Sequence, residues 1–319
     1  MAVPAGTQTS ISITTNLRED LSKIVYALEP DETPVLSKAK KVTAKKHQTD
    51  WLTDGLRAAK VNAKVEGDDI AATARTPRPR LNNMIQIFAD PVRLSDTAEK
   101  GATAEGKKQF AIELAKELKA HKLDIELAFF ANNAKVTGDG ATVANELAGL
   151  PAWIATNTVA GATGVDPTGD GTDARTDGTL TDFTEANLKT VMQDMWTAGS
   201  MATTVYLPAD LQTGASAFTG NAPRREMKDA GKVNSYIDVY ITDFSSKKGV
   251  EFIPHRHMRA SDVIITDDET IRVGTYIPTK QEKLGKTGLS NAVLISTQLT
   301  LIVGNEKKLG GVFDRQAAA

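Results

Sequence analysis

The sequence predicts an α+β fold, in which helices and short strands surround a central sheet that carries insertions. Three observations support this class. We expect a long amphipathic helix near residues 104–131, a helix followed by an apolar strand near residues 184–208, and a series of short strands after residue 230. The chain shows no internal repeat at a fixed period.

The N-terminal segment is expected to be an extended arm followed by a short amphipathic helix. Residues 1–15 are rich in Thr and Ser and lack a helical period. Apolar side chains then recur at helical spacing, namely Leu17, Leu21, Ile24, Val25 and Leu28. Pro30 and Pro34 are expected to end this helix, because a residue before proline is pushed out of the helical region. The segment has little core of its own and should lie across another surface.

A long connection between two predicted strands indicates a projecting hairpin. The strands cover residues 47–53 and 81–88. The connection is polar and rich in alanine, and it ends in a stretch with Arg75, Arg78 and Arg80 separated by Thr and Pro. A loop of this length inside a compact domain needs a function. Packing on a neighbouring subunit would provide one.

The clearest single element is the helix near residues 104–131. Its apolar face follows steps of three and four residues through Phe110, Leu114, Leu118, His121, Ile125 and Phe129. Gly101 and Gly106 indicate a break before it, and Asn132 and Gly138 end it. At about 1.5 Å per residue the helix is roughly 40 Å long, which suits a structural spine.

The rest of the chain is expected to combine a loop, a second helix and short strands. Residues 161–178 are rich in Gly, Thr and Asp, a helix covers residues 184–199, and an apolar run follows at 204–208. The later strands are expected at residues 233–242, 250–254, 263–266, 271–277 and 292–303.

Composition and charge exclude several classes of site. The 319 residues include no cysteine, which excludes disulfides, thiolate metal sites and a cysteine nucleophile, and fits folding in a reducing cytoplasm. The net charge of −2 argues against a protein that holds nucleic acid through an overall basic excess. No run approaches the roughly 20 apolar residues of a membrane span, so no membrane partner is expected. A secretory signal is not visible either.

The charge is unevenly distributed along the chain. Residues 38–80 hold eleven basic and five acidic side chains, a net of +6, whereas residues 1–37 hold two basic and five acidic side chains, a net of −3. We therefore expect the cationic hairpin to meet acidic surfaces on neighbouring copies, which would set register and orientation more than affinity.

Two histidines near the C-terminal third suggest a metal site. His255 and His257 are two residues apart and would share one face of a strand, but zinc needs at least one further ligand. Only His47 and His121 remain, and His121 lies on the apolar helical face. A surface strand is the alternative, and a metal-dependent hydrolase built around His255 and His257 is kept as a competing hypothesis.

Other motifs do not indicate catalysis. Residues 166–173 faintly resemble a calcium loop but lack the regular alternation of oxygen ligands and the terminal glutamate. The basic run at residues 38–46 lacks aromatic side chains for stacking on bases, so a solvated face or a subunit contact is expected there rather than DNA. The sequence has no P-loop and no GxSxG motif. We predict no enzyme activity and no catalytic, cofactor-binding or metal-binding residue.

Several stretches, in order along nearly the whole chain, resemble the family of tailed-bacteriophage major capsid proteins with the Hong Kong ninety-seven-type fold. Each stretch alone is weak, and their collinearity carries the signal. They are residues 16–22 (Asn-Leu-Arg-Glu-Asp-Leu-Ser), 31–36, 47–51 (His-Gln-Thr-Asp-Trp), 123–126, 184–199, 267–276, 282–288 (Glu-Lys-Leu-Gly-Lys-Thr-Gly) and 299–307.

The resemblance implies an architecture with five parts. These are an N-terminal arm (1–45), an extended hairpin loop with its strands (46–95), a peripheral domain with a long spine helix (96–149), an axial domain (150–265) and the C-terminal strands of the peripheral domain (266–319). Because Met1 leads straight into the arm, we expect a separate scaffolding protein or none.

The resemblance also implies a function and partners. The chain is expected to assemble with itself into pentamers and hexamers that form the icosahedral head around packaged double-stranded DNA, without sequence-specific binding. Portal, scaffolding and cement proteins are the other expected partners. Assembly is expected in the cytoplasm of the host bacterium and the product in the virion. An encapsulin-like compartment that holds a cargo enzyme is the alternative within the same fold.

Six residues are predicted to contact an adjacent subunit. Three belong to the cationic stretch of the hairpin, one to its first strand and two to the arm helix. They are Arg75, Arg78, Arg80, Trp51, Leu17 and Leu21.

Overall fold

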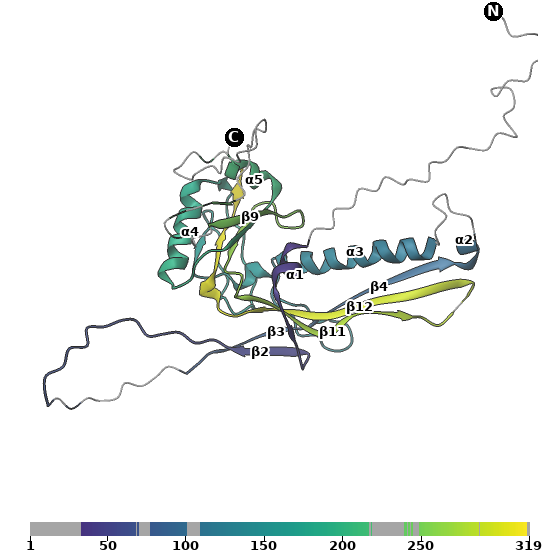
Figure 1. Cartoon of the computed structure of the whole chain (residues 1–319), viewed down its shortest axis with the longest axis horizontal. Coiled ribbons are helices and arrows are strands. Elements are labelled where there is room, and N and C mark those ends of the chain that lie inside the picture. The colour runs from purple at the N-terminus through teal and green to yellow at the C-terminus, as the bar shows by residue number, and fades with distance from the viewer. Residues whose placement is uncertain are drawn as a thin grey trace, which may run out of the picture.

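A computed structural model of the chain describes residues 33–67, 69, 77–100, 109–216, 218, 239–240, 242, 244, 249–286 and 288–317. The arm helix expected at residues 17–28 lies outside these residues, and so does most of the strand expected at 233–242. Within them, the structure is built on two sheets with helices on their faces (Figure 1).

The first sheet has four strands in the order β1-β11-β12-β4, which are β1 (Lys40–Thr43), β11 (Ile271–Lys283), β12 (Ser290–Val303) and β4 (Gln86–Ser95). Helix α3 (Gln109–Phe130) runs along one face of this sheet (Figure 1). Side chains along β4 alternate between inward and exposed, as a strand with one covered face requires. Two short helices, α1 (Pro34–Lys38) and α2 (Asp96–Lys100), lie beside α3.

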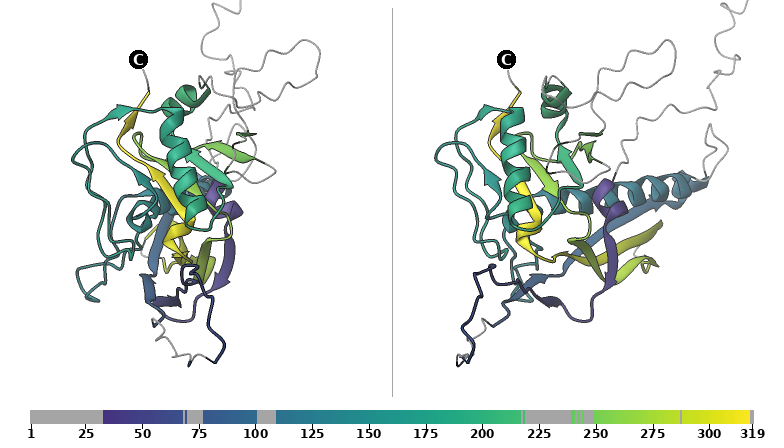
Figure 2. Two further views of the ribbon diagram at one scale, coloured as in Figure 1. Left: turned by 90° about the vertical axis from the view of Figure 1, so that its left-hand side faces the viewer. Right: turned by 60° about the vertical axis from the view of Figure 1, so that its left-hand side comes forward.

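The second sheet has six strands in the order β5-β13-β10-β7-β9-β8. They are β5 (Thr158–Val159), β13 (Leu309–Val312), β10 (Val263–Thr266), β7 (Thr204–Leu207), β9 (Val250–Pro254) and β8 (Val239–Tyr240). Helix α4 (Glu185–Thr197) packs on β13, and the two lie side by side in Figure 2. Helix α5 (Ala209–Ser216) follows β7. Because β13 pairs with β10, the chain returns to this sheet after β12.

Smaller elements complete the fold. The strands β2 (Gln48–Leu52) and β3 (Arg80–Met84) form a separate hairpin, and β14 (Arg315–Gln316) pairs with β6 (Thr181–Asp182). Two 3₁₀ turns are η1 (Leu150–Trp153) and η2 (Glu306–Lys308).

The buried apolar residues form two clusters. The first gathers the C-terminal half of α3, the turn η1 and the inward faces of β11 and β12, and it also includes Tyr206, Ile264 and Leu309 of the six-stranded sheet. The second gathers α4, β7 and β10. Full burial of an aliphatic or aromatic side chain contributes about 1.5–3 kcal/mol to folding, so these clusters hold each sheet to its helices.

Most of the elements predicted within the described residues are confirmed, with two differences. The long helix is present at Gln109–Phe130, but only its C-terminal half is fully buried, at His121, Ile125 and Phe129. The single strand predicted at 81–88 is wrong. The chain changes partner at Ile85, so that β3 pairs with β2 and β4 pairs with β12.

The helix that Pro34 is expected to end, at residues 17–28, lies outside the described residues. Pro34 itself occupies the first turn of α1. Proline is favoured there because the first helical N–H groups have no partner within the helix and its fixed φ suits the helix. The following segment, β1, then pairs in parallel with β11 and forms the edge of the first sheet.

Candidate functional site

The hairpin formed by β2 and β3 carries a segment that projects far from the two sheets (Figure 1). Its apolar side chains have no cover. Leu56 is 102% exposed, Val61 96% and Val65 80%, and Leu52 at the end of β2 is 62% exposed. Exposed apolar stretches of this kind are typical of surfaces that contact another molecule.

Two arginines predicted at subunit contacts lie at the base of this projection. Arg78 Nε donates to Asp54 Oδ2 at 2.7 Å, and Arg80 Nη2 donates to Asp50 Oδ2 at 2.5 Å. The hydrogen bond from Arg80 holds the pKa of Asp50 below its usual value. Both arginine side chains stay about two-thirds exposed, at 64% and 66%. Arg75 lies outside the described residues.

Trp51, also predicted at a subunit contact, packs within its own chain. Its ring centroid lies 5.4 Å from that of Trp153, which is fully buried in the first core cluster. Trp51 itself is half-buried. The side chain therefore fastens the base of the hairpin to the core. Its role toward another subunit stays a prediction, and Leu17 and Leu21 lie outside the described residues.

A buried carboxylate that was not predicted from the sequence binds α1, the short helix that follows the first described residue. Glu126 in α3 is fully buried. Its Oε1 accepts from the backbone N–H of Val35 at 2.8 Å and its Oε2 from that of Leu36 at 2.9 Å. His255 Nε2 lies 3.2 Å from Oε1. A carboxylate in the core requires such donors, because burying an unpaired charge is costly.

This arrangement answers the metal hypothesis at His255 and His257. The Nδ1 atom of His255 accepts from the backbone N–H of His257 at 3.2 Å, and its Nε2 faces Glu126. Both ring nitrogens of His255 are thus used in hydrogen bonds. Within the described part of the chain, no group of three His, Cys, Asp or Glu side chains is arranged to hold a metal ion.

The loop at residues 166–173 forms its own hydrogen bonds. The Thr172 hydroxyl and N–H donate to Asp170 at 2.5 Å and 2.8 Å, and the Thr168 hydroxyl and N–H donate to Asp173 at 2.5 Å and 3.1 Å. The carboxylates therefore order the turn itself, and the loop does not form the oxygen cage that calcium requires.

The longer stretch around this loop is acidic. Residues 136–182 hold seven acidic side chains and one basic side chain, Arg175, for a net of −6. Arg175 is buried, where it donates to Asp314 at 2.5 Å and to Asp177 at 3.2 Å, so it pairs with one exposed carboxylate of the stretch itself. Asp139, Glu146 and Asp182 are exposed. We call residues 136–182 the acidic loop segment.

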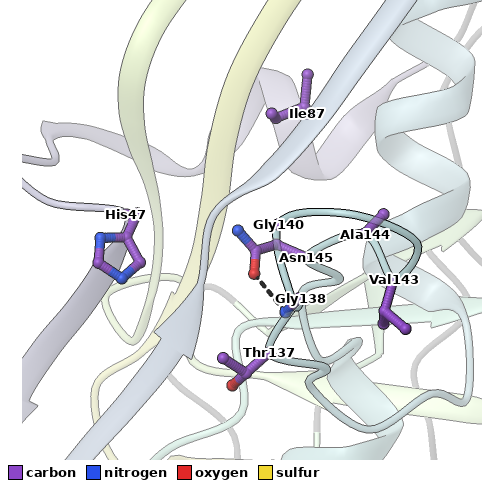
Figure 3. A pocket seen from close by; sticks show the side chains of 8 residues that line it. All are labelled: His47, Ile87, Thr137, Gly138, Gly140, Val143, Ala144 and Asn145. Atoms are coloured by element: carbon purple, nitrogen blue, oxygen red, sulfur yellow. Dashed lines mark hydrogen bonds between the residues drawn. The ribbon is translucent and has the colours of Figure 1, made fainter.

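A pocket lies between the first residues of this segment, Ile87 of β4 and His47 at the base of the hairpin (Figure 3). Its volume is about 330 Å³, and it is lined by His47, Ile87, Thr137, Gly138, Gly140, Val143, Ala144 and Asn145. Asn145 Oδ1 accepts from the Gly138 N–H at 2.7 Å and closes the loop on one side (Figure 3). Of the lining residues only His47 is titratable, so the pocket offers no acid–base pair for catalysis.

Among the described residues, none of the helices combines the length and the apolar character that crossing a lipid bilayer requires.

Nearly the whole chain is similar to known capsid proteins. A family model described as SU10 major capsid protein matches residues 4–315. No curated protein matches the chain.

Solved structures share the fold at low sequence identity. A structure titled "Cyanophage A-1(L) capsid asymmetric unit" has a TM-score of 0.68 at 11% identity, covering 97% of this chain and 99% of that one. A Mycobacterium phage Cain structure gives 0.60 at 14%, covering 98% and 100%. An empty GTA particle capsid gives 0.58 at 14%, covering 98% and 99%.

Proposed function

Because the chain belongs to the SU10 major capsid protein family, and is therefore a shell subunit of an icosahedral bacteriophage head, we propose that its projecting hairpin fastens each subunit to a neighbouring copy. Copies joined in this way would form the pentamers and hexamers that close around double-stranded DNA. A portal protein and separate scaffolding or cement proteins would complete the head. Assembly would take place in the cytoplasm of the host bacterium.

The single observation that carries this proposal is the exposure of the apolar side chains on the projection. Leu56 and Val61 are essentially fully exposed within one subunit. Burying apolar surface contributes about 25 cal/mol per Å², so a docked hairpin would gain most of its binding energy from these side chains. Surface ion pairs contribute only about 0–1 kcal/mol each and would add orientation.

Charge supports the choice of the receiving surface. Five of the lysines that make residues 38–80 cationic precede the hairpin, and residues 48–84 carry a net charge of only +1. The positive charge of the hairpin is concentrated at residues 75–80, which hold three arginines and no acidic side chain, whereas the acidic loop segment carries −6. We propose that the hairpin of one copy lies against the acidic loop segment of the next. Both surfaces recur on every subunit, so one kind of contact can be repeated around a ring.

The division into parts is also a proposal. The four-stranded sheet with α3 would be the peripheral domain and the six-stranded sheet with α4 the axial domain. The predicted assignment of all residues after 265 to the peripheral domain would then need one change. Residues 309–312 lie in the six-stranded sheet, beside β10.

The arginines at the base of the hairpin give the sharpest test. The double substitution Arg78→Glu with Arg80→Glu reverses two charges that should face the neighbour, so the yield of closed shells should fall. Each in-chain ion pair is exposed, so the unfolding midpoint of the unassembled subunit should change little.

A charge swap distinguishes the ion pair that Arg80 makes within its own chain from the proposed contact of Arg80 with a neighbouring copy. Arg80→Asp combined with Asp50→Arg keeps the in-chain ion pair and the net charge but moves the cation to the other strand. The proposal expects the swap to leave assembly impaired. Full assembly by the swapped variant would show that Arg80 acts only within its own chain.

The family match does not favour the encapsulin-like alternative. The content of purified particles would distinguish the two, since a phage head encloses DNA and an encapsulin-like compartment encloses protein.

A further inference from the structure

We propose that Glu126 is a positioning residue for assembly: it fixes the place and direction from which residues 1–32 leave the subunit, and this placement is needed for the arm to meet a neighbouring copy. The inference rests on the proposed shell function, because it assumes that the arm works between subunits. Its basis is a single buried side chain that contacts three separate parts of the chain.

The hydrogen bonds around Glu126 indicate a carboxylate rather than a carboxylic acid. Both backbone contacts come from N–H groups, and each needs an acceptor. His255 accepts at Nδ1 from the His257 N–H, so the hydrogen of a neutral ring sits on Nε2 and points to Glu126. Three donors therefore surround two oxygens, which satisfies a buried charge.

These contacts fix residues 34–38, which we call the arm root, to the buried core. If residues 34–38 moved away, the carboxylate would lose two of its three donors while remaining buried. Because a buried charge without partners is strongly unfavourable, the segment is held in one place. Val35, which also supplies one of the N–H groups, is itself buried in the first core cluster.

The segment is held at its other end as well. After α1, strand β1 pairs in parallel with β11, and the Ala44 N–H donates to the Thr275 carbonyl at 2.9 Å. The chain from Thr33 to Ala44 is thus fixed at both ends, and Thr33 is the first described residue. Glu126 therefore fixes the position of the first residues that the structure describes, next to Thr33.

His255 connects the same carboxylate to the second sheet. It follows β9 directly, and its backbone N–H donates to the Leu207 carbonyl at the end of β7. Its ring also packs on Phe130, with centroids 4.2 Å apart. Glu126 therefore connects the arm root, α3 and the six-stranded sheet through hydrogen bonds, so that displacing any one of them breaks a bond to the same carboxylate.

The test uses the full chain and two substitutions of Glu126. Glu126→Gln keeps the size but replaces one oxygen by an amide donor, which would face a backbone N–H group of Val35 or Leu36. Glu126→Asp keeps the charge but is too short to reach both N–H groups, and it carries the test if the glutamine variant does not fold. Ile125→Val is the control, since it loosens the same buried turn of α3 but leaves the hydrogen bonds from Val35 and Leu36 to Glu126 in place.

Two readouts separate positioning from general stability. Hydrogen exchange of residues 33–38 should rise about tenfold or more in the Glu126 variants relative to the buried strands β10 and β12, and the yield of closed shells should fall. Ile125→Val should leave the relative exchange of residues 33–38 and the shell yield unchanged.

Two results would overturn the inference. One is unchanged exchange at residues 33–38 in both Glu126 variants. The other is raised exchange with a normal yield of shells, which would show that assembly does not need the arm root. Neither result resembles failure of the proposed function, in which the unaltered chain itself would form no shells.

Discussion

The Nδ1 atom of His121 lies 2.5 Å from Oδ2 of Asp90, and this contact fastens α3 to the four-stranded sheet. On the other side of the ring, Nε2 lies 2.8 Å from the hydroxyl of Thr297, which in turn contacts the hydroxyl of Thr279 at 2.8 Å. The chain of polar contacts starts in β4 and crosses β12 to β11. These contacts fix the position of α3 along the sheet, because hydrogen bonds need specific partners whereas apolar side chains can pack in several positions.

Replacing His121 should therefore destabilise the subunit. His121→Ala leaves a cavity and removes the partner of Asp90 and Thr297, so we expect the free energy of unfolding to fall by about 2–4 kcal/mol. Urea unfolding of the unassembled subunit measures this. His47→Ala is the control, because its side chain is exposed, and it should change the free energy by less than about 0.5 kcal/mol. Equal effects of the two substitutions would contradict the account.

A second prediction concerns the buried ion pair near the C-terminus. Arg175 donates to both oxygens of Asp314, and its guanidinium carbon lies 4.4 Å from the centroid of the Phe313 ring. Burial raises the pKa of Asp314, but hydrogen bonds from Arg175, Gly178 and Gly161 outweigh it and hold that pKa below its usual value.

Asp314→Asn should cost about 3–5 kcal/mol of unfolding free energy, because it leaves the Arg175 charge buried with weaker partners. Asparagine tolerates the left-handed backbone at this position (φ 57°), so the backbone is not the cause. Asp177→Asn, at an exposed partner of the same arginine, should cost less than about 1 kcal/mol. A thermal or urea melt that ranked the two variants in the opposite order would refute this prediction.

The third prediction is a pH dependence centred on Asp262. Burial raises the pKa of Asp262 to about 6, although Arg259 and the Ser261 hydroxyl act in the opposite direction. The folded state thus binds a proton more tightly than the unfolded chain, where the pKa is near 3.8. The resulting stabilisation is fully present below pH 3.8 and is lost as the pH rises through about 6.

Asp262→Asn removes this titration and provides the measurement. The unfolding free energy of the unaltered subunit, taken relative to that of the variant, should be about 2 kcal/mol more favourable at pH 4.5 than at pH 7. Because both proteins share all other titrating groups, the contributions of those groups cancel in the difference between the two unfolding free energies. A difference that stays constant over this range would show that Asp262 does not titrate in it.

The fourth prediction tests the packing of α4 on β13. A Cβ atom added at Gly310 would lie 2.5 Å from Val191 Cγ1 and 2.8 Å from Met195 Sδ, both in α4. Gly310→Ala should therefore push the helix away and cost about 1–3 kcal/mol. Gly214→Ala, in α5, meets nothing within 4 Å and should stabilise the subunit by up to about 1 kcal/mol. Stabilisation by both substitutions would mean that α4 and β13 are not closely packed.

The elements that could be predicted from the sequence are those determined by local spacing. The apolar steps of α3 and the helix predicted at residues 184–199 follow from neighbouring residues, and both helices are present. The division between β3 and β4 could not be predicted, because the apolar run looks continuous. A long-range choice of partner strand decides it.

The candidate site was predicted only in part. The projecting hairpin followed from the length of the loop and its prolines. The tilted contact between the rings of Trp51 and Trp153 could not be predicted from local sequence, since the two residues lie far apart in the chain. Glu126 did have a local signal: it lies three and four residues before Phe129 and Phe130, which places it on the buried face of the helix.

Electron microscopy of the purified full chain, with sedimentation to measure the assembled fraction, tests the central claim most directly. The subunit is predicted to form closed icosahedral particles in which the hairpin of each copy lies against the next, so that the apolar side chains of residues 52–65 are covered. A compact monomer at every concentration, alone and with candidate scaffolding proteins, would contradict it.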